Sequence, residues 1–146
     1  MSDWTVLTEL EEIDKFLEFV VDLHDGLVKE VHYINDNYVD RDRSMEYREK
    51  AQVRMLIQKQ MSPLFFLELR FEGVSRLVLS PHEIIFGAEI KETGVDSPER
   101  SRFHFEFCYS NIEFDRMKWR EVPDWHGREA RFGEDFRPPP IMTEEW

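Results

Sequence analysis

The chain contains a single cysteine, Cys108, among its 146 residues. A disulfide within the chain is therefore excluded, and we expect a reducing compartment, with the cytoplasm as the default. The first ten residues carry acids where a secretory signal carries bases before an apolar run, so we expect no such signal. The longest apolar runs, such as 64–67, are far shorter than the roughly 20 residues of a membrane span, which predicts no membrane partner.

Sequence signatures of catalysis are also missing. The chain has no phosphate-binding glycine loop, dinucleotide fingerprint, nucleophile elbow or Cys-x-x-Cys pair. We therefore assign no catalytic residue, no metal ligand and no cofactor from motifs. This favours a non-catalytic protein and leaves enzymatic activity undecided.

Basic residues are much fewer than acidic ones. Nineteen Lys and Arg stand against 31 Asp and Glu, which gives a formal net charge of -12 at pH 7. Such a surface repels phosphate backbones, so we expect no nucleic-acid partner. The same field attracts a basic protein, although acidity of this degree also serves solubility alone.

The chain is rich in the side chains that build a core. Hydrophobic residues make up 41% and include twelve Phe, as is typical of a single domain of this length. We predict one helix-plus-antiparallel-sheet domain over residues 1–122. Residues 123–146, which contain Pro138–Pro140, are predicted to form a tail that is extended or wraps the domain.

An amphipathic helix is predicted over residues 9–23. Thr8 and Glu11 have the spacing of a capping box, and Asp25–Gly26 provides the stop. Apolar residues recur between them at three- and four-residue spacing, which places them on one face. This stripe consists of Leu10, Ile13, Phe16, Leu17, Val20 and Val21.

After Gly26 the hydrophobic period changes from 3.6 to 2, most clearly in 65–72 and 103–109, which predicts six or seven strands. Residues 40–50 are expected to be an exposed connection, and a shift of the alternation at Asp115–Arg116 predicts a bulge. Short connections favour antiparallel pairing. The predicted fold is α+β: an N-terminal amphipathic helix packed on a mainly antiparallel, curved sheet, as a meander or a sandwich.

Candidate binding residues form two groups. His24–Asp25, with His32 further along, supplies the imidazole and carboxylate groups used by metal sites and general bases. The same pair also suits structural capping at a helix end. Trp119, Trp125 and His126 are residue types that are common in binding surfaces, and they suit a packed tail equally well.

Two stretches carry a family resemblance: residues 23–33, where His-Asp precedes a strand, and residues 67–77, with the strand pattern Leu-x-Leu-x-Phe-x-x-Val. Over residues 16–90 the chain resembles small bacterial proteins of uncharacterised function, some of which are similar to immunity proteins of polymorphic toxin systems. The charged stretch 40–50 and the tail after Pro123 depart from the pattern. The resemblance implies a toxin-neutralising role and carries over no catalytic residues.

Three functional hypotheses follow. The first is a binding module that engages a basic protein partner through an acidic surface. The second is a metal-dependent hydrolase that uses His24, Asp25 and His32. The third is a homo-oligomeric structural protein, such as a homodimer, in which an exposed strand edge pairs with its copy.

Overall fold

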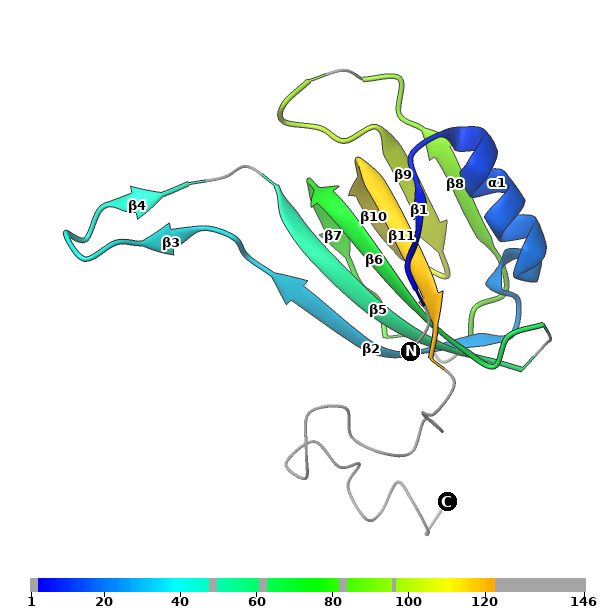
Figure 1. Ribbon diagram of the computed structural model, residues 1–146. Coiled ribbons are helices and arrows are strands. Elements are labelled where there is room, and N and C mark those ends of the chain that lie inside the picture. The colour runs from blue at the N-terminus through cyan, green and yellow to red at the C-terminus, as the bar shows by residue number, and fades with distance from the viewer. Residues whose placement is uncertain (1–2, 48–49, 61–62, 82–83, 96, 123–146) are drawn as a thin grey trace, which may run out of the picture.

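The N-terminal helix, α1, spans Leu10–Phe19 and follows a short strand, β1 (Thr5–Leu7). The computed structural model describes residues 3–47, 50–60, 63–81, 84–95 and 97–122 (Figure 1). The carboxylate of Glu12 caps the helix by accepting the backbone N–H groups of Thr8 (3.2 Å) and Glu9 (3.0 Å). The predicted helix is thus confirmed, but its capping acid is one residue later than expected.

The predicted helix end at residue 23 is wrong. After Phe19 the chain enters a single tight turn, η1 (Val21–Leu23), in which the three φ angles are 55°, 52° and 56°. Left-handed backbone is costly for residues other than glycine. Burial of Val20 and Leu23 in the core offsets that cost, because the turn directs both side chains inward.

Two antiparallel sheets form the body of the protein (Figure 1). The five-stranded sheet has the order β1-β11-β6-β5-β2 and the four-stranded sheet has the order β7-β10-β9-β8. The five-stranded sheet adds to β1 the strands β2 (Gly26–Ile34), β5 (Ala51–Lys59), β6 (Phe66–Val74) and β11 (Arg116–Glu121). The four-stranded sheet contains β7 (Arg76–Val78), β8 (Ala88–Glu92), β9 (Phe103–Phe107) and β10 (Ser110–Phe114). The α+β class and the antiparallel pairing are confirmed.

A third, two-stranded sheet begins just before the predicted exposed connection, residues 40–50, and extends into it. Strands β3 (Tyr38–Val39) and β4 (Met45–Glu46) pair as a hairpin arm that projects away from the two sheets (Figure 1). The described residues therefore contain eleven strands where six or seven were predicted. The extra strands are mostly of two or three residues, too short to show an alternating pattern.

The predicted bulge at Asp115 is a corner where the chain passes from one sheet to the other. Strand β10 ends in the four-stranded sheet and β11 begins in the five-stranded sheet, with Asp115 between them. The chain makes the same passage at Ser75, between β6 and β7. Gly73 has a φ of 66°, and a Cβ there would meet the Asp115 side chain, so the corner requires glycine.

The core lies between the two sheets, and α1 closes one side of it. Phe71 of the five-stranded sheet packs against Phe105 and Phe114 of the other, at ring-centroid distances of 5.6 and 5.0 Å. Helix α1 contacts β1 and β8, which are edge strands of the two sheets, and Phe16 packs on Trp119. The opposite edge strands, β2 and β7, have no helix between them in the part of the chain that the structure describes.

Candidate functional site

His24 and Asp25 form a half-exposed pair at the entrance to β2. The imidazole Nδ1 lies 3.1 Å from the Asp25 carboxylate. The pair does not cap α1, because that helix ends at Phe19, and His24 instead closes the η1 turn with its backbone N–H donating to Val21. The Asp25 backbone N–H donates to Ile85 at 2.8 Å, which fixes the segment against the chain before β8.

The structure does not bring His32 to this pair. His32 lies on β2, about 20 Å from Gly26 at the ~3.3 Å rise of a strand, and its Nε2 lies 3.3 Å from Glu30. Within the described ranges, no three His, Cys, Asp or Glu side chains gather as metal ligands would. The residues proposed for a hydrolase thus occupy two separate His–carboxylate pairs.

Trp119 is half-buried under the helix. Its ring lies 5.1 Å from that of Phe16 and 6.0 Å from that of Phe19, measured between centroids. It therefore joins α1 to the five-stranded sheet. The other two members of the predicted aromatic group, Trp125 and His126, lie outside the described residues.

The outer side of α1 is strongly acidic. Between Glu9 and Asp22 there are six carboxylates and one lysine, Lys15, which pairs with Glu11 at 3.2 Å. Two apolar side chains lie exposed at the end of this segment, Phe19 (47% exposed) and Val21 (42%). We call this surface, residues 9–22 on the solvent side of α1 and η1, the acidic face.

No helix in the described part of the chain has the length and apolar character needed to cross a bilayer.

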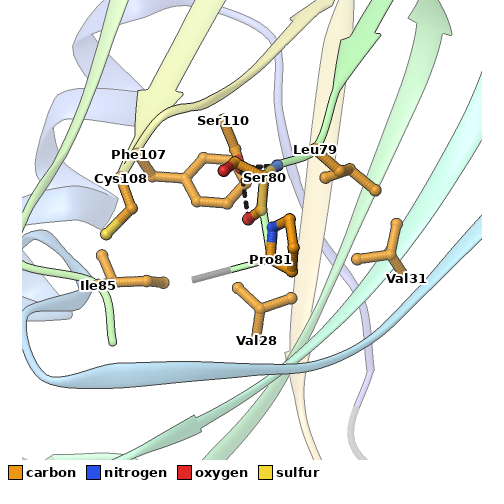
Figure 2. A pocket seen from close by; sticks show the side chains of 9 residues that line it. All are labelled: Val28, Val31, Leu79, Ser80, Pro81, Ile85, Phe107, Cys108 and Ser110. Atoms are coloured by element: carbon orange, nitrogen blue, oxygen red, sulfur yellow. Dashed lines mark hydrogen bonds between the residues drawn. The ribbon is translucent and has the colours of Figure 1, made fainter. Parts of the chain in front are cut away.

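An apolar pocket of about 250 Å³ lies on the side of the molecule where β2 and β7 leave the sheets open. Side chains of β2, of the segment after β7 and of the β9–β10 turn face one another across it (Figure 2). The lining residues are Val28, Val31, Leu79, Ser80, Pro81, Ile85, Phe107, Cys108 and Ser110.

Several polar groups of this pocket are already hydrogen-bonded within the wall. The Ser110 hydroxyl accepts the Ser80 backbone N–H at 2.9 Å, and the Cys108 thiol donates to the carbonyl of Ile84 at 2.8 Å. Cys108 and Tyr109 form the two-residue turn between β9 and β10. Their φ angles are 45° and 40°, a conformation in which Asn-Gly is the usual sequence. The pocket therefore presents a mostly apolar surface with a strained turn at its rim.

Two buried charges escaped prediction from the sequence, and both lie on the central strands of the five-stranded sheet. Glu68 is fully buried on the outer face, where Arg54 donates to it at 2.7 Å and Arg120 at 2.9 Å. Burial alone would raise the pKa of Glu68, but these two guanidinium groups outweigh it and lower the pKa. The sequence did contain a signal for this buried charge: Glu68 lies on a predicted strand, and arginines occur on the strands to either side, at Arg54 and Arg120.

Lys59 is buried on the inner face, and its Nζ has no hydrogen-bond partner among the described residues. Burial lowers the pKa of its amine. The signal for it was present in the sequence, because the alternation of Val53, Met55 and Ile57 continues to Lys59.

A third ionic group lies on the four-stranded sheet. The buried carboxylate of Glu113 lies 3.0 Å from His104 Nδ1 and accepts N–H groups of Arg100 at 3.1–3.3 Å. Burial would raise the pKa of Glu113, but the His104 and Arg100 hydrogen bonds outweigh it and hold the pKa below its ordinary value. The cross-strand pairing of positions 104 and 113 was not derivable before the register was known.

Comparison of the chain with protein-family models, with curated proteins and with solved structures finds no match. The resemblance to immunity proteins therefore stays a prediction.

Proposed function

We propose that this protein is a non-catalytic binding module whose acidic face engages a basic protein partner. The observation that carries the proposal is the concentration of six carboxylates against one lysine on a single helical segment. Because these carboxylates lie close together along α1 and its two ends, their fields add, which raises the rate of encounter with a positively charged surface.

The exposed apolar pair at the end of the acidic face supports a direct contact. Phe19 and Val21 are flanked by Glu18 and Asp22, so an apolar centre would be rimmed by charge. Protein interfaces commonly have this arrangement, in which the centre is desolvated and the rim sets orientation. Phe19 also contacts Trp119, which holds its ring in place before binding.

A basic toxin domain is the class of partner we propose, because the sequence resembles proteins similar to immunity proteins. In that role the protein would act in the cytoplasm by covering a cationic surface of the toxin. The hydrolase alternative gains no supporting contact from the described residues, because His32 lies apart from His24 and Asp25. The homo-oligomer alternative would pair an edge strand such as β2, β7 or β8 with its copy.

The test uses basic proteins encoded by genes that flank the gene of this protein. Each is purified and titrated with wild-type protein by calorimetry in 50 mM and 500 mM salt. We expect one of them to bind at low salt and to weaken steeply at high salt, because exposed charges are screened beyond roughly 8 Å at 0.15 M.

A charge-reversal pair separates this face from general acidity. Asp14→Lys with Glu18→Lys reverses two exposed charges on α1, whereas Asp42→Lys with Glu46→Lys reverses two exposed charges on the hairpin arm. Both doubles change the net charge equally. We expect the α1 double to lose at least about tenfold in affinity and the arm double to change little, since like charges at a contact repel strongly. Equal losses, or binding that salt does not affect, would contradict the proposal.

A further inference from the structure

We infer that the pocket between β2 and the β9–β10 turn is a binding site for a small, uncharged, apolar molecule the size of one aromatic ring with a short alkyl group. The pocket shares no lining residue with the acidic face, which ends at Asp22, three residues before the Asp25 backbone that bonds to Ile85 in the pocket wall. The inference is therefore independent of the proposed protein partner.

The size of the pocket sets the size of the ligand. A dry apolar cavity of about 150 Å³ is enough to hold benzene, so a pocket of about 250 Å³ accommodates a substituted ring. The space is partly open to solvent rather than sealed in the core, which gives a ligand a route of entry.

The chemistry of the wall sets the polarity of the ligand. Val28, Val31 and Ile85 supply apolar surface, and no lysine, arginine or carboxylate is among the lining residues that the structure describes. Ser110 already accepts a hydrogen bond from Ser80 in the wall, and Cys108 already donates one to the neighbouring carbonyl of Ile84. Against the described lining, a charged ligand would lose its hydration without gaining a partner, whereas an apolar one would displace weakly held water.

The pocket is held in shape by backbone contacts, so a ligand does not have to order it. Ile85 exchanges two hydrogen bonds of 2.8 Å with the chain at Asp25 and Gly26. On the other wall, the turn at Cys108–Tyr109 keeps a left-handed backbone without glycine. Strain of this kind persists where surrounding structure fixes it, and it is common at binding sites.

Cys108 makes the inference testable, because it is the only thiol of the chain and lines the pocket. The probe is toluene, added to the full-length protein, with benzoate as a charged molecule of similar shape. At a toluene concentration about ten times its dissociation constant, we expect alkylation of Cys108 by iodoacetamide to slow about tenfold, since only the empty fraction reacts. Methyl resonances of Val28, Val31 and Ile85 should shift together, and benzoate should do neither.

A matched pair of variants locates the effect. Val31→Phe fills the pocket from β2, and Lys29→Phe adds the same ring at an exposed position of the same strand. Protection by toluene should be lost in the first variant and kept in the second. Val28→Phe replaces Val31→Phe if circular dichroism shows the latter unfolded.

Three results would overturn the inference: no protection of wild-type Cys108 up to the solubility limit of toluene, methyl shifts spread through the core between the sheets, or binding of benzoate as tight as that of toluene. The comparison of toluene with benzoate needs only the wild-type protein, so it decides the matter even if both filling variants fail to fold.

Discussion

Glu68 and Lys59 are buried on opposite faces of the same sheet, on the neighbouring strands β6 and β5. Glu68 is 0% exposed and receives hydrogen bonds from two arginines, while Lys59 is 1% exposed and its Nζ has no partner among the described residues. Equal burial therefore has opposite effects on the charged forms of these two side chains. The pKa shift favours the charged form of the carboxylate and disfavours the charged form of the amine.

The surroundings explain the difference. The outer face of the sheet carries cationic side chains on three adjacent strands, and the ring of Trp4 stacks on Arg120 at 4.4 Å. A carboxylate among them completes an ionic network. The inner face is lined by aliphatic and aromatic residues, and the amine at its end has no hydrogen-bond partner in the described part of the chain.

The largest effect is expected from breaking the paired site. Glu68→Ala should lower the free energy of unfolding by about 3 kcal/mol, because it leaves Arg54 and Arg120 facing each other without a counter-charge. Urea unfolding followed by circular dichroism measures this. Glu72→Ala, on the same face and strand but half-buried, serves as the control with a smaller loss. Equal losses in the two variants would show that Glu68 is not the centre of the network.

A smaller effect of opposite sign is expected from the unpaired site. Lys59→Met keeps the length and apolar stem of the side chain and removes the buried amine, so we expect stabilisation of about 1–2 kcal/mol. Gln58→Met, one residue away on the outer face, is the matched control and should be near neutral. A destabilised Lys59→Met would mean that the amine is held by a favourable contact.

The pH dependence sharpens the same comparison. Lys59 has a lowered pKa in the folded state, so the unfolded chain binds more protons between that pKa and the ordinary value of about 10.4. Stability should therefore rise with pH across this window, by at most about 1.4 kcal/mol per pH unit. Urea titrations from pH 7 to 10 should show the rise in wild type and not in Lys59→Met. Parallel curves would contradict the assignment.

The smallest effect is expected at Glu113, whose Arg100 partner is half-exposed. Glu113→Gln should cost about 1 kcal/mol at pH 7. The lowered pKa of Glu113 means that its contribution is present above about pH 4.3 and is lost as the pH falls through the folded value. The acid limb of the stability curve should be shallower in Glu113→Gln than in wild type. His104→Gln tests whether the imidazole shares in the effect.

Much of the fold was predictable because local periodicity reports burial. The stripe that includes Ile13 and Phe16 identified the helix, and the alternation of Phe103, Phe105 and Phe107 identified a strand with one face in the core. The change of alternation at Asp115 was detected, but a bulge and a passage between sheets leave the same mark in the sequence. Only the pairing of β10 with β9 and of β11 with β6 distinguishes them.

The candidate sites were less predictable. His24 and Asp25 are adjacent in the chain and do lie together, whereas His32, on the following strand β2, does not join them. The pocket draws on β2 and on two segments more than 45 residues away, so nothing local marks it. The assignments to residues 123–146, including Trp125 and His126, lie outside the described residues and stay predictions.

The sequence by itself determined the class of the protein: one amphipathic helix, alternating strands and an acidic surface, each a property of neighbouring residues and their spacing. The tertiary structure alone decided which strands share a sheet, which charge obtained partners and where the apolar pocket lies. Those features depend on contacts between residues distant in the chain, and the free energy of such contacts is set by register and packing rather than by local pattern.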